Sequence, residues 1–61
     1  MKTYVLTVFE KDGKKLLDEK IEAKTDLEAK EIGQEKLDKE GYSEHTHRLV
    51  SPNAKLLLFH S

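Results

Sequence analysis

Hydrophobic and polar residues alternate with a period of two near the start of the chain. In KTYVLTVFE, Tyr4, Leu6 and Val8 alternate with a second set of apolar or β-branched residues. A short alternating run rich in such side chains predicts a strand. A second, similar run, KKLLDEKIEA, follows Asp12-Gly13, a pair typical of a two-residue type I′ turn. The first 23 residues are therefore expected to form a β-hairpin.

The register of this hairpin follows from the turn. A two-residue turn pairs Val8 with Leu17 and Tyr4 with Ile21, which places the larger apolar side chains on one face. A three-residue turn over KDG would instead set Asp18 and Lys20 among them. The apolar pattern favours the two-residue turn.

The next segment, TDLEAKEIGQEKLDKEGY, has the start and stop signals of a helix. Thr25 and Glu28 fit a capping box, in which the threonine hydroxyl accepts from the Glu28 N–H and the Glu28 carboxylate reaches back. Gly41 is suited to the left-handed position that ends a helix. We expect a helix from Asp26 to Glu40, with a buried stripe formed by Ala29, Ile32, Gly33, the stem of Lys36, and Leu37. A glycine inside a helix costs about 1 kcal/mol relative to alanine, and a close approach of the helix to a sheet would explain Gly33.

The remaining residues predict a second hairpin. Its strands run from about Glu44 to Val50 and from Lys55 to His60, and SPNA lies between them. Pro52 cannot adopt the positive φ of a two-residue primed turn, so a type I turn with Pro52 in its second position is expected. The loop then has three or four residues.

The element order ββαββ predicts an α+β fold with one four-stranded sheet and one helix across one face. The most apolar runs are VLTVF and LLLF, which favours the first and last strands as parallel neighbours at the centre. That arrangement is a mixed sheet of order 2-1-4-3, similar in layout to the immunoglobulin-binding domain of protein G, a β-grasp-like fold. The 61 residues are expected to form a single domain.

Composition and charge limit the classes of function. The chain has no cysteine, which excludes disulfides, thiolate metal sites and a sulfur nucleophile. Its longest apolar run, Leu56 to Phe59, is far too short to span a membrane, and its N-terminus lacks the features of a signal peptide, so we expect a cytoplasmic protein with no membrane partner. The net charge of −1 lacks the basic excess of nucleic-acid-binding domains. Nucleic acid is therefore not an expected partner.

The three histidines are the candidate metal ligands. His45 and His47 lie two apart on a predicted strand and would share one face, a geometry that lets two imidazoles approach one ion. Tight zinc binding needs a third ligand, and His60 is the histidine available for that place. A four-residue loop sets His45 opposite His60, whereas a three-residue loop sets Thr46 there. A weak zinc, nickel or copper site is the alternative function, and solvent-facing strand histidines are the simpler interpretation.

No pattern typical of an enzyme appears. Ser43, Ser51 and Ser61 lack the glycine-flanked turn of a serine nucleophile. The acidic residues alternate with lysines in a manner typical of a solvated helix face. A fold of two thin layers also leaves little room for a ligand pocket. We therefore predict a noncatalytic protein without a cofactor.

The face of the sheet that the helix does not cover is the strongest candidate for function. Both sets of alternate residues in the first and last strands are apolar. Some of the residues Val5, Phe9 and Leu16, and either Leu56 and Leu58 or Leu57 and Phe59, are therefore expected to point away from the helix. Exposed apolar patches usually mark association, although long lysine and arginine stems can also shield them. The leading hypothesis is a small interaction module that forms a homodimer or binds a protein partner through this face.

Three stretches resemble the YhzD-like family of short bacterial proteins: YVLTVFEKDGKKLLDE, EAKEIGQEKL and GYSEHTHRLVSPNAKLLLFH. The resemblance spans nearly the whole chain and implies a bacterial, cytoplasmic protein. It implies no activity, because the family has no assigned function. Members of that family tend to have glycine after SP-x, where this chain has Ala54.

Overall fold

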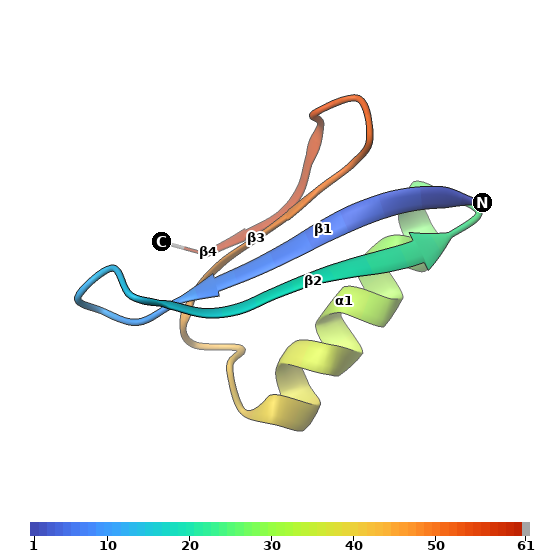
Figure 1. Cartoon of the computed structure of the whole chain (residues 1–61). Helices are drawn as coiled ribbons and strands as arrows, with labels where there is room; N and C mark the ends of the chain where they lie inside the picture. Colours follow the sequence, from blue (N-terminus) through green and yellow to red (C-terminus); the bar gives the residue numbers. More distant parts are fainter. Residues whose placement is uncertain (61) are drawn as a thin grey trace.

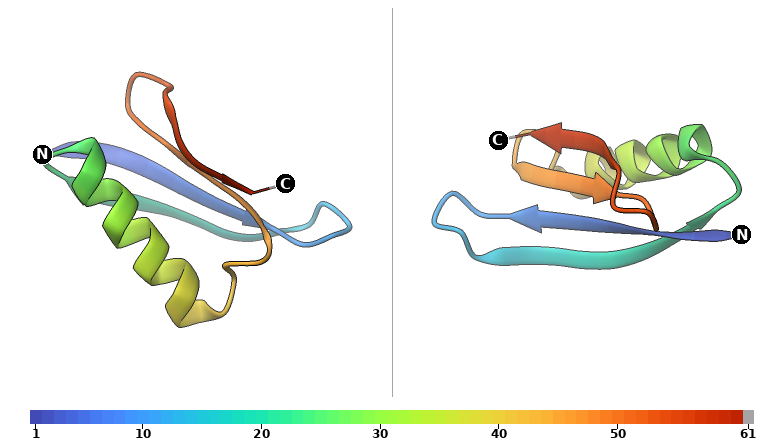
Figure 2. Two further views of the ribbon diagram at one scale, coloured as in Figure 1. Left: turned by 180° about the vertical axis from the view of Figure 1, so that it is seen from behind. Right: turned by 90° about the horizontal axis from the view of Figure 1, so that it is seen from above.

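The computed structural model describes residues 1–60, and over that range it contains a four-stranded sheet with one helix against one side (Figure 1). The strands are β1 (Lys2–Phe9), β2 (Lys15–Ala23), β3 (Thr46–Val50) and β4 (Leu56–His60), and the helix is α1 (Asp26–Glu40). Seen from behind and from above, α1 lies diagonally across one face and leaves the other face open (Figure 2). The predicted α+β class and ββαββ order are confirmed. Ser61, considered above as a nucleophile, lies outside the described residues.

The predicted strand order was wrong. The sheet has the order β2-β1-β3-β4, and all of its pairs are antiparallel, so it is not the mixed 2-1-4-3 sheet of protein G. The helix packs closer to β2 than to β4, and only residues 41–45 connect it to β3. This short connection places β3 directly beside β1, with Thr46 opposite Phe9. The apolar β4 is left at the edge.

The first hairpin keeps the predicted register but not the predicted turn. Tyr4 lies opposite Ile21, and Val8 lies opposite Leu17, as expected. The loop is a type I turn, in which the Gly13 N–H donates to the Glu10 carbonyl (2.9 Å), and Gly13 has φ 89°. The loop has three residues, one more than the two-residue loop of a type I′ turn. A bulge that leaves Leu16 without a partner between Phe9 and Val8 restores the apolar register.

The second hairpin has the same construction. The Ala54 N–H donates to the Ser51 carbonyl (2.9 Å), which confirms a type I turn with Pro52 in its second position. Ala54 has φ 65° and occupies the place that Gly13 takes in the first hairpin. A bulge at Leu57 follows, between the pairs Val50–Leu56 and Leu49–Leu58. The register therefore shifts by one residue inside β4, which neither expected loop length predicts.

The helix begins and ends where predicted. The Thr25 hydroxyl accepts from the Glu28 N–H (3.1 Å), while the Glu28 carboxylate accepts from the Lys24 N–H (3.2 Å), one residue earlier than in the expected box. Gly41 has φ 75°, and the Tyr42 N–H donates to the Leu37 carbonyl (2.8 Å), which completes a Schellman motif. Both ends of α1 are thus stabilised by local hydrogen bonds.

The core lies between α1 and one face of the sheet. Its fully buried members include Tyr4, Leu6, Val8, Leu37 and Leu49. Ile32, expected in the buried helical stripe, is instead 37 % exposed, whereas Ala29, Gly33 and Leu37 are buried. A Cβ atom on Gly33 would lie 3.2 Å from Leu49 Cδ2 and 3.5 Å from Leu58 Cδ1. The close approach of helix and sheet therefore accounts for this glycine.

Candidate functional site

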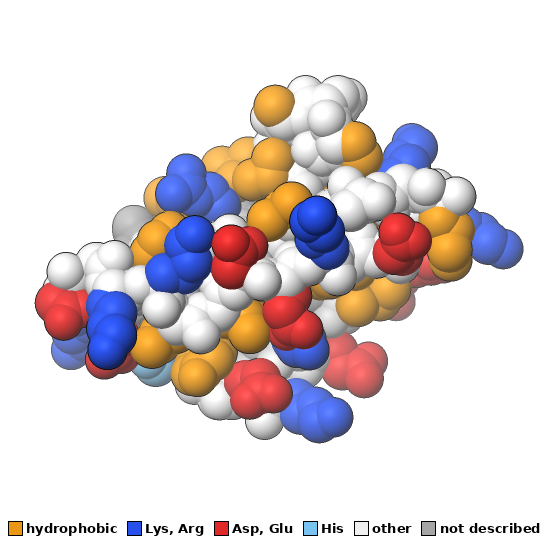
Figure 3. All heavy atoms as spheres, viewed as in Figure 1, with side chains coloured by type: hydrophobic (Ala, Val, Ile, Leu, Met, Phe, Trp, Pro, Cys, Tyr) orange, Lys and Arg blue, Asp and Glu red, His pale blue; other side chains and the backbone are white. Residues whose placement is uncertain are grey.

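The open face of the sheet has an apolar surface formed by β1, β3 and β4. We define the open-face patch by its apolar members, which are Val5, Phe9, Val50, Leu56 and Phe59. Val5, Phe9 and Val50 are half-buried, whereas Leu56 is 51 % and Phe59 61 % exposed. In Figure 3, which views this face, hydrophobic side chains gather over β3, β4 and the adjoining side of β1, while charged side chains follow β2. The patch is thus next to the free edge of β4 and bounded by charge on the side of β2.

Arg48 is the charged side chain within this patch. It lies directly opposite Phe59 in the β3–β4 pair, and its guanidinium carbon is 5.7 Å from the centroid of the Phe9 ring. This distance allows a cation–π contact between the guanidinium and the Phe9 ring. Phe9 is thus half-buried with Arg48 beside its ring, whereas Phe59 stays largely exposed.

The bulges decide which of the predicted apolar residues reach the open face. Val5 and Phe9 lie there, as expected. Leu16, the third expected member, packs against the buried core, as does its counterpart Leu57 in the second hairpin. Because the bulge at Leu57 changes the alternation, Leu56 and Phe59 are the β4 residues on this face, one from each of the two pairs expected from the sequence. Sequence alternation alone assumes a regular strand and could not find this combination.

His45 does not share a strand face with His47. It precedes β3 in a turn, where its N–H donates to the Tyr42 carbonyl (3.0 Å). Its imidazole lies 5.1 Å from the Tyr42 ring, between centroids, and its Nε2 is 3.4 Å from a carboxylate oxygen of Glu10. The side chain of His45 therefore contacts the first hairpin and not the other histidines.

His47 and His60 form a separate pair on the helix side of the sheet. They lie opposite each other in the β3–β4 register, with ring centroids 5.6 Å apart. His47 is buried, and its Nδ1 lies 2.9 Å from the His45 carbonyl oxygen. The buried Nδ1 of His60 has no hydrogen-bond partner within residues 1–60. The structure thus brings together two of the three predicted ligands, and the described residues contain no group of three or more that could hold a metal ion.

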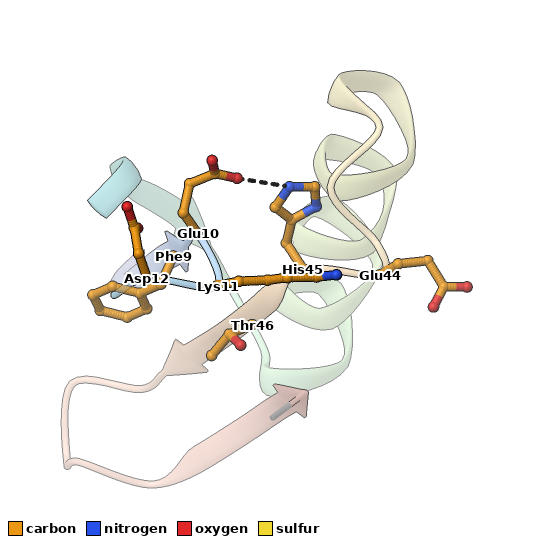
Figure 4. Close-up of a pocket in the computed structure, with 7 residues that line it drawn as sticks. All are labelled: Phe9, Glu10, Lys11, Asp12, Glu44, His45 and Thr46. Carbon is orange, nitrogen blue, oxygen red and sulfur yellow. Dashed lines mark ion pairs between the residues drawn. The ribbon is translucent and has the colours of Figure 1, made fainter. Parts of the chain in front are cut away.

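A pocket of about 480 Å³ lies between the β1–β2 turn and the segment that connects α1 to β3. Its lining residues are Phe9, Glu10, Lys11, Asp12, Glu44, His45 and Thr46. In Figure 4 the Glu10 and His45 side chains point toward each other, while those of Glu44 and Thr46 point away from this pair. The Asp12 carboxylate already accepts a hydrogen bond from the Lys14 N–H (3.0 Å). The polar groups therefore do not converge on one point where a substrate atom could react.

Tyr4 is a fully buried side chain at the junction of the sheet and the helix. Its hydroxyl donates to an Asp26 carboxylate oxygen (2.7 Å), which ties β1 to the first residue of α1. Burial, and then the hydrogen bond to Asp26, raise the pKa of Tyr4 to about 12. The side chain connects the sheet to the helix and lies in the core, on the face of the sheet opposite to the open-face patch. Its role is structural.

The fold and these surfaces define a small α+β domain with an open sheet face, in which nothing indicates catalysis. A family model described as YhzD-like protein matches residues 1–61. The chain belongs to the YhzD-like family. It is 43 % identical over 60 residues to a Bacillus subtilis (strain 168) protein described as "Uncharacterized protein YhzD", with 98 % of each chain covered. No solved structure matches the chain. Within residues 1–60, no helix is long and apolar enough to cross a membrane.

Proposed function

We propose that this chain is a small noncatalytic interaction module that binds a protein through the open face of its sheet. The observation that supports this proposal is the exposure of Leu56 and Phe59 beside the apolar side chains of β1 and β3. A contiguous apolar surface on a small soluble domain favours association, because burying it removes apolar area from water. On the helix, Ala29, Gly33 and Leu37 are buried in the core, and Leu27 and Ile32 are the large apolar side chains that stay exposed.

The test compares two substitutions that add the same charge at different places. Phe9→Lys puts a cation in the open-face patch, whereas Leu27→Lys replaces a 68 % exposed leucine on the helix. Sedimentation at high micromolar concentration measures self-association, and capture from a lysate of the native host, followed by reconstitution with the purified captured protein, measures binding to another protein. We expect Phe9→Lys to abolish binding and Leu27→Lys to leave it unchanged. Equal binding by both variants, with both folded, would refute the open face as the binding surface.

Location and the absence of a nucleic-acid partner stay predictions. The net charge of −1 supports the second, since the counterion release that drives nonspecific nucleic-acid binding needs clustered cations. Cell fractionation tests the cytoplasmic location. A binding assay with a random DNA duplex at low salt tests the predicted absence of a nucleic-acid partner, and micromolar affinity would contradict that prediction.

A further inference from the structure

The two edges of the sheet differ in how they are protected from pairing with another strand. β2 carries Lys15, Asp18, Glu19, Lys20 and Glu22 along its nine residues, and Glu19 forms an ion pair with Lys36 of α1 (2.7 Å). Charged side chains on an edge strand disfavour its addition to a second sheet. β4, at the other edge, has the sequence LLLFH and contains no Lys, Arg, Asp or Glu. Although 38 % of the residues in the chain are charged, β4 carries none of these charges and still lies at an edge of the sheet.

We infer that β4 pairs with β4 of a second copy of this chain, antiparallel and across a two-fold axis, to form a continuous eight-stranded sheet. This inference rests on the proposed function, because it names the occupant of the binding surface. An edge strand exposes a row of backbone N–H and C=O groups, which a second strand can satisfy. A two-fold interface brings the same surface of both copies together, so it requires a strand that is compatible with itself.

The residues of β4 meet this requirement. With the axis at Phe59, the two copies of Phe59 face each other on the open side of the sheet, and Leu58 faces His60 of the second copy on the helix side. These are apolar or aromatic cross-strand pairs, which stabilise antiparallel sheets. The nearest lysine along the chain is Lys55, and in this register the two copies of Lys55 lie about 26 Å apart at roughly 3.3 Å per residue. That separation exceeds the screening length of about 8–10 Å at physiological salt, so these lysines do not oppose pairing.

The open-face patch continues across the same axis. Leu56 and Phe59, its two most exposed members, lie on β4 itself. Pairing at the β4 edges would bring both copies of these residues into one apolar surface on the open side of the joined sheet. A second copy therefore covers exposed apolar area as well as backbone groups, which a charged or helical partner would not do.

Charge on the helix side opposes the association and makes it weak. The groove between α1 and Leu58 is lined by Lys30, Glu31, Gln34, Glu35 and Asp38, with three acids against one lysine. These groups face the axis on both copies, so like charges approach each other when the edges pair. Salt screens this repulsion. We therefore expect association to strengthen as the salt concentration rises.

Hydrogen exchange of the intact chain at two concentrations, with sedimentation in parallel, tests the inference. For a dimer with Kd of about 100 µM, raising the concentration from about 10 µM to about 1 mM should slow exchange roughly fourfold, by mass action, at the outward β4 amides. Amides of β2, the other edge, serve as the internal control and should not slow. The variant Leu56→Lys should remove the concentration dependence, whereas Leu27→Lys, at a 68 % exposed leucine of α1, should keep it.

Each outcome has a distinct meaning. Slowing confined to β4, lost in Leu56→Lys and enhanced by salt, supports edge pairing. A dimer that Phe9→Lys abolishes and that leaves the β4 amides unprotected would overturn edge pairing but agree with binding through the open face. A strict monomer at about 1 mM would overturn the inference, and the proposed function would then be decided by the capture experiment alone.

Discussion

Ala54 is expected to be a stability defect that a single substitution repairs. It has φ 65° at the third position of the β3–β4 loop, where the first hairpin has Gly13 with φ 89°. A left-handed conformation costs an L-residue roughly 1–2 kcal/mol. Ala54 is exposed, so removing its methyl group loses no buried contact. Ala54→Gly should therefore relieve the backbone strain without a packing penalty.

The net gain is smaller than the strain, because glycine also stabilises the unfolded chain. The added unfolded-state entropy offsets about 0.4–1 kcal/mol, which leaves a gain of about 0.5–1 kcal/mol in the free energy of unfolding. For a domain of this size, such a gain raises Tm by roughly 2–8 °C. Urea denaturation should show a higher midpoint with an unchanged m-value.

Gly13→Ala is the matched control. A Cβ atom on Gly13 would meet no heavy atom within 4 Å, so its cost comes from the backbone alone. We expect this variant to lose about as much stability as Ala54→Gly gains. If Ala54→Gly has no effect or destabilises the protein while Gly13→Ala destabilises it, the two loops do not share one geometry, and the reasoning is refuted.

Four further predictions concern the helix and its contact with the sheet. Thr25→Ala should lower the free energy of unfolding by about 1 kcal/mol, because the N-cap is lost. Gly41→Val should lower it by more, because a β-branched residue resists φ 75°. Thermal melts measure both effects, and an unchanged melt for Gly41→Val would contradict the Schellman motif at the end of the helix. Gly33→Ala should destabilise by about 1 kcal/mol in urea, because overpacking against Leu49 outweighs the gain in helix propensity; a stabilised variant would show that Leu49 yields. The pKa of Tyr4 is raised in the folded state, so the stability it contributes is present below pH 10 and is lost as pH rises toward 12. Tyr4→Phe should flatten that decline in a pH series of melts, and an equal decline in both proteins would assign it to other groups.

Local signals predicted the elements well, and long-range order less well. The N-cap at Thr25, the glycine ending at Gly41 and the type I turn at Pro52 each depend on chemistry within a few residues, and all three are confirmed. The strand order instead depends on which strand of the first hairpin lies next to β3, the strand that follows the helix. The apolarity of LLLF, taken as evidence for a central strand, instead belongs to an edge strand with exposed Leu56 and Phe59.

The candidate site was predicted in part for the same reason. Alternation placed Val5 and Phe9 on the open face, since β1 is regular between Tyr4 and Val8. It could not place Leu16, His60 or Phe59, because each follows a loop whose extra residue is compensated by a bulge. A signal was present in the two hairpins, since in each the third residue after the left-handed loop residue is a leucine, Leu16 after Gly13 and Leu57 after Ala54. One sequence does not reveal that this leucine forms a bulge.

The most direct test of the central claim is a dilution series of amide NMR spectra of the intact protein. The claim is that the open sheet face associates and the outer face of the helix does not. The account predicts that the largest concentration-dependent shifts fall on β4 and on the open-face patch, including Phe9 and Val50, while α1 amides near Leu27 stay constant. Spectra that do not change up to about 1 mM, or shifts confined to the helix, would contradict it.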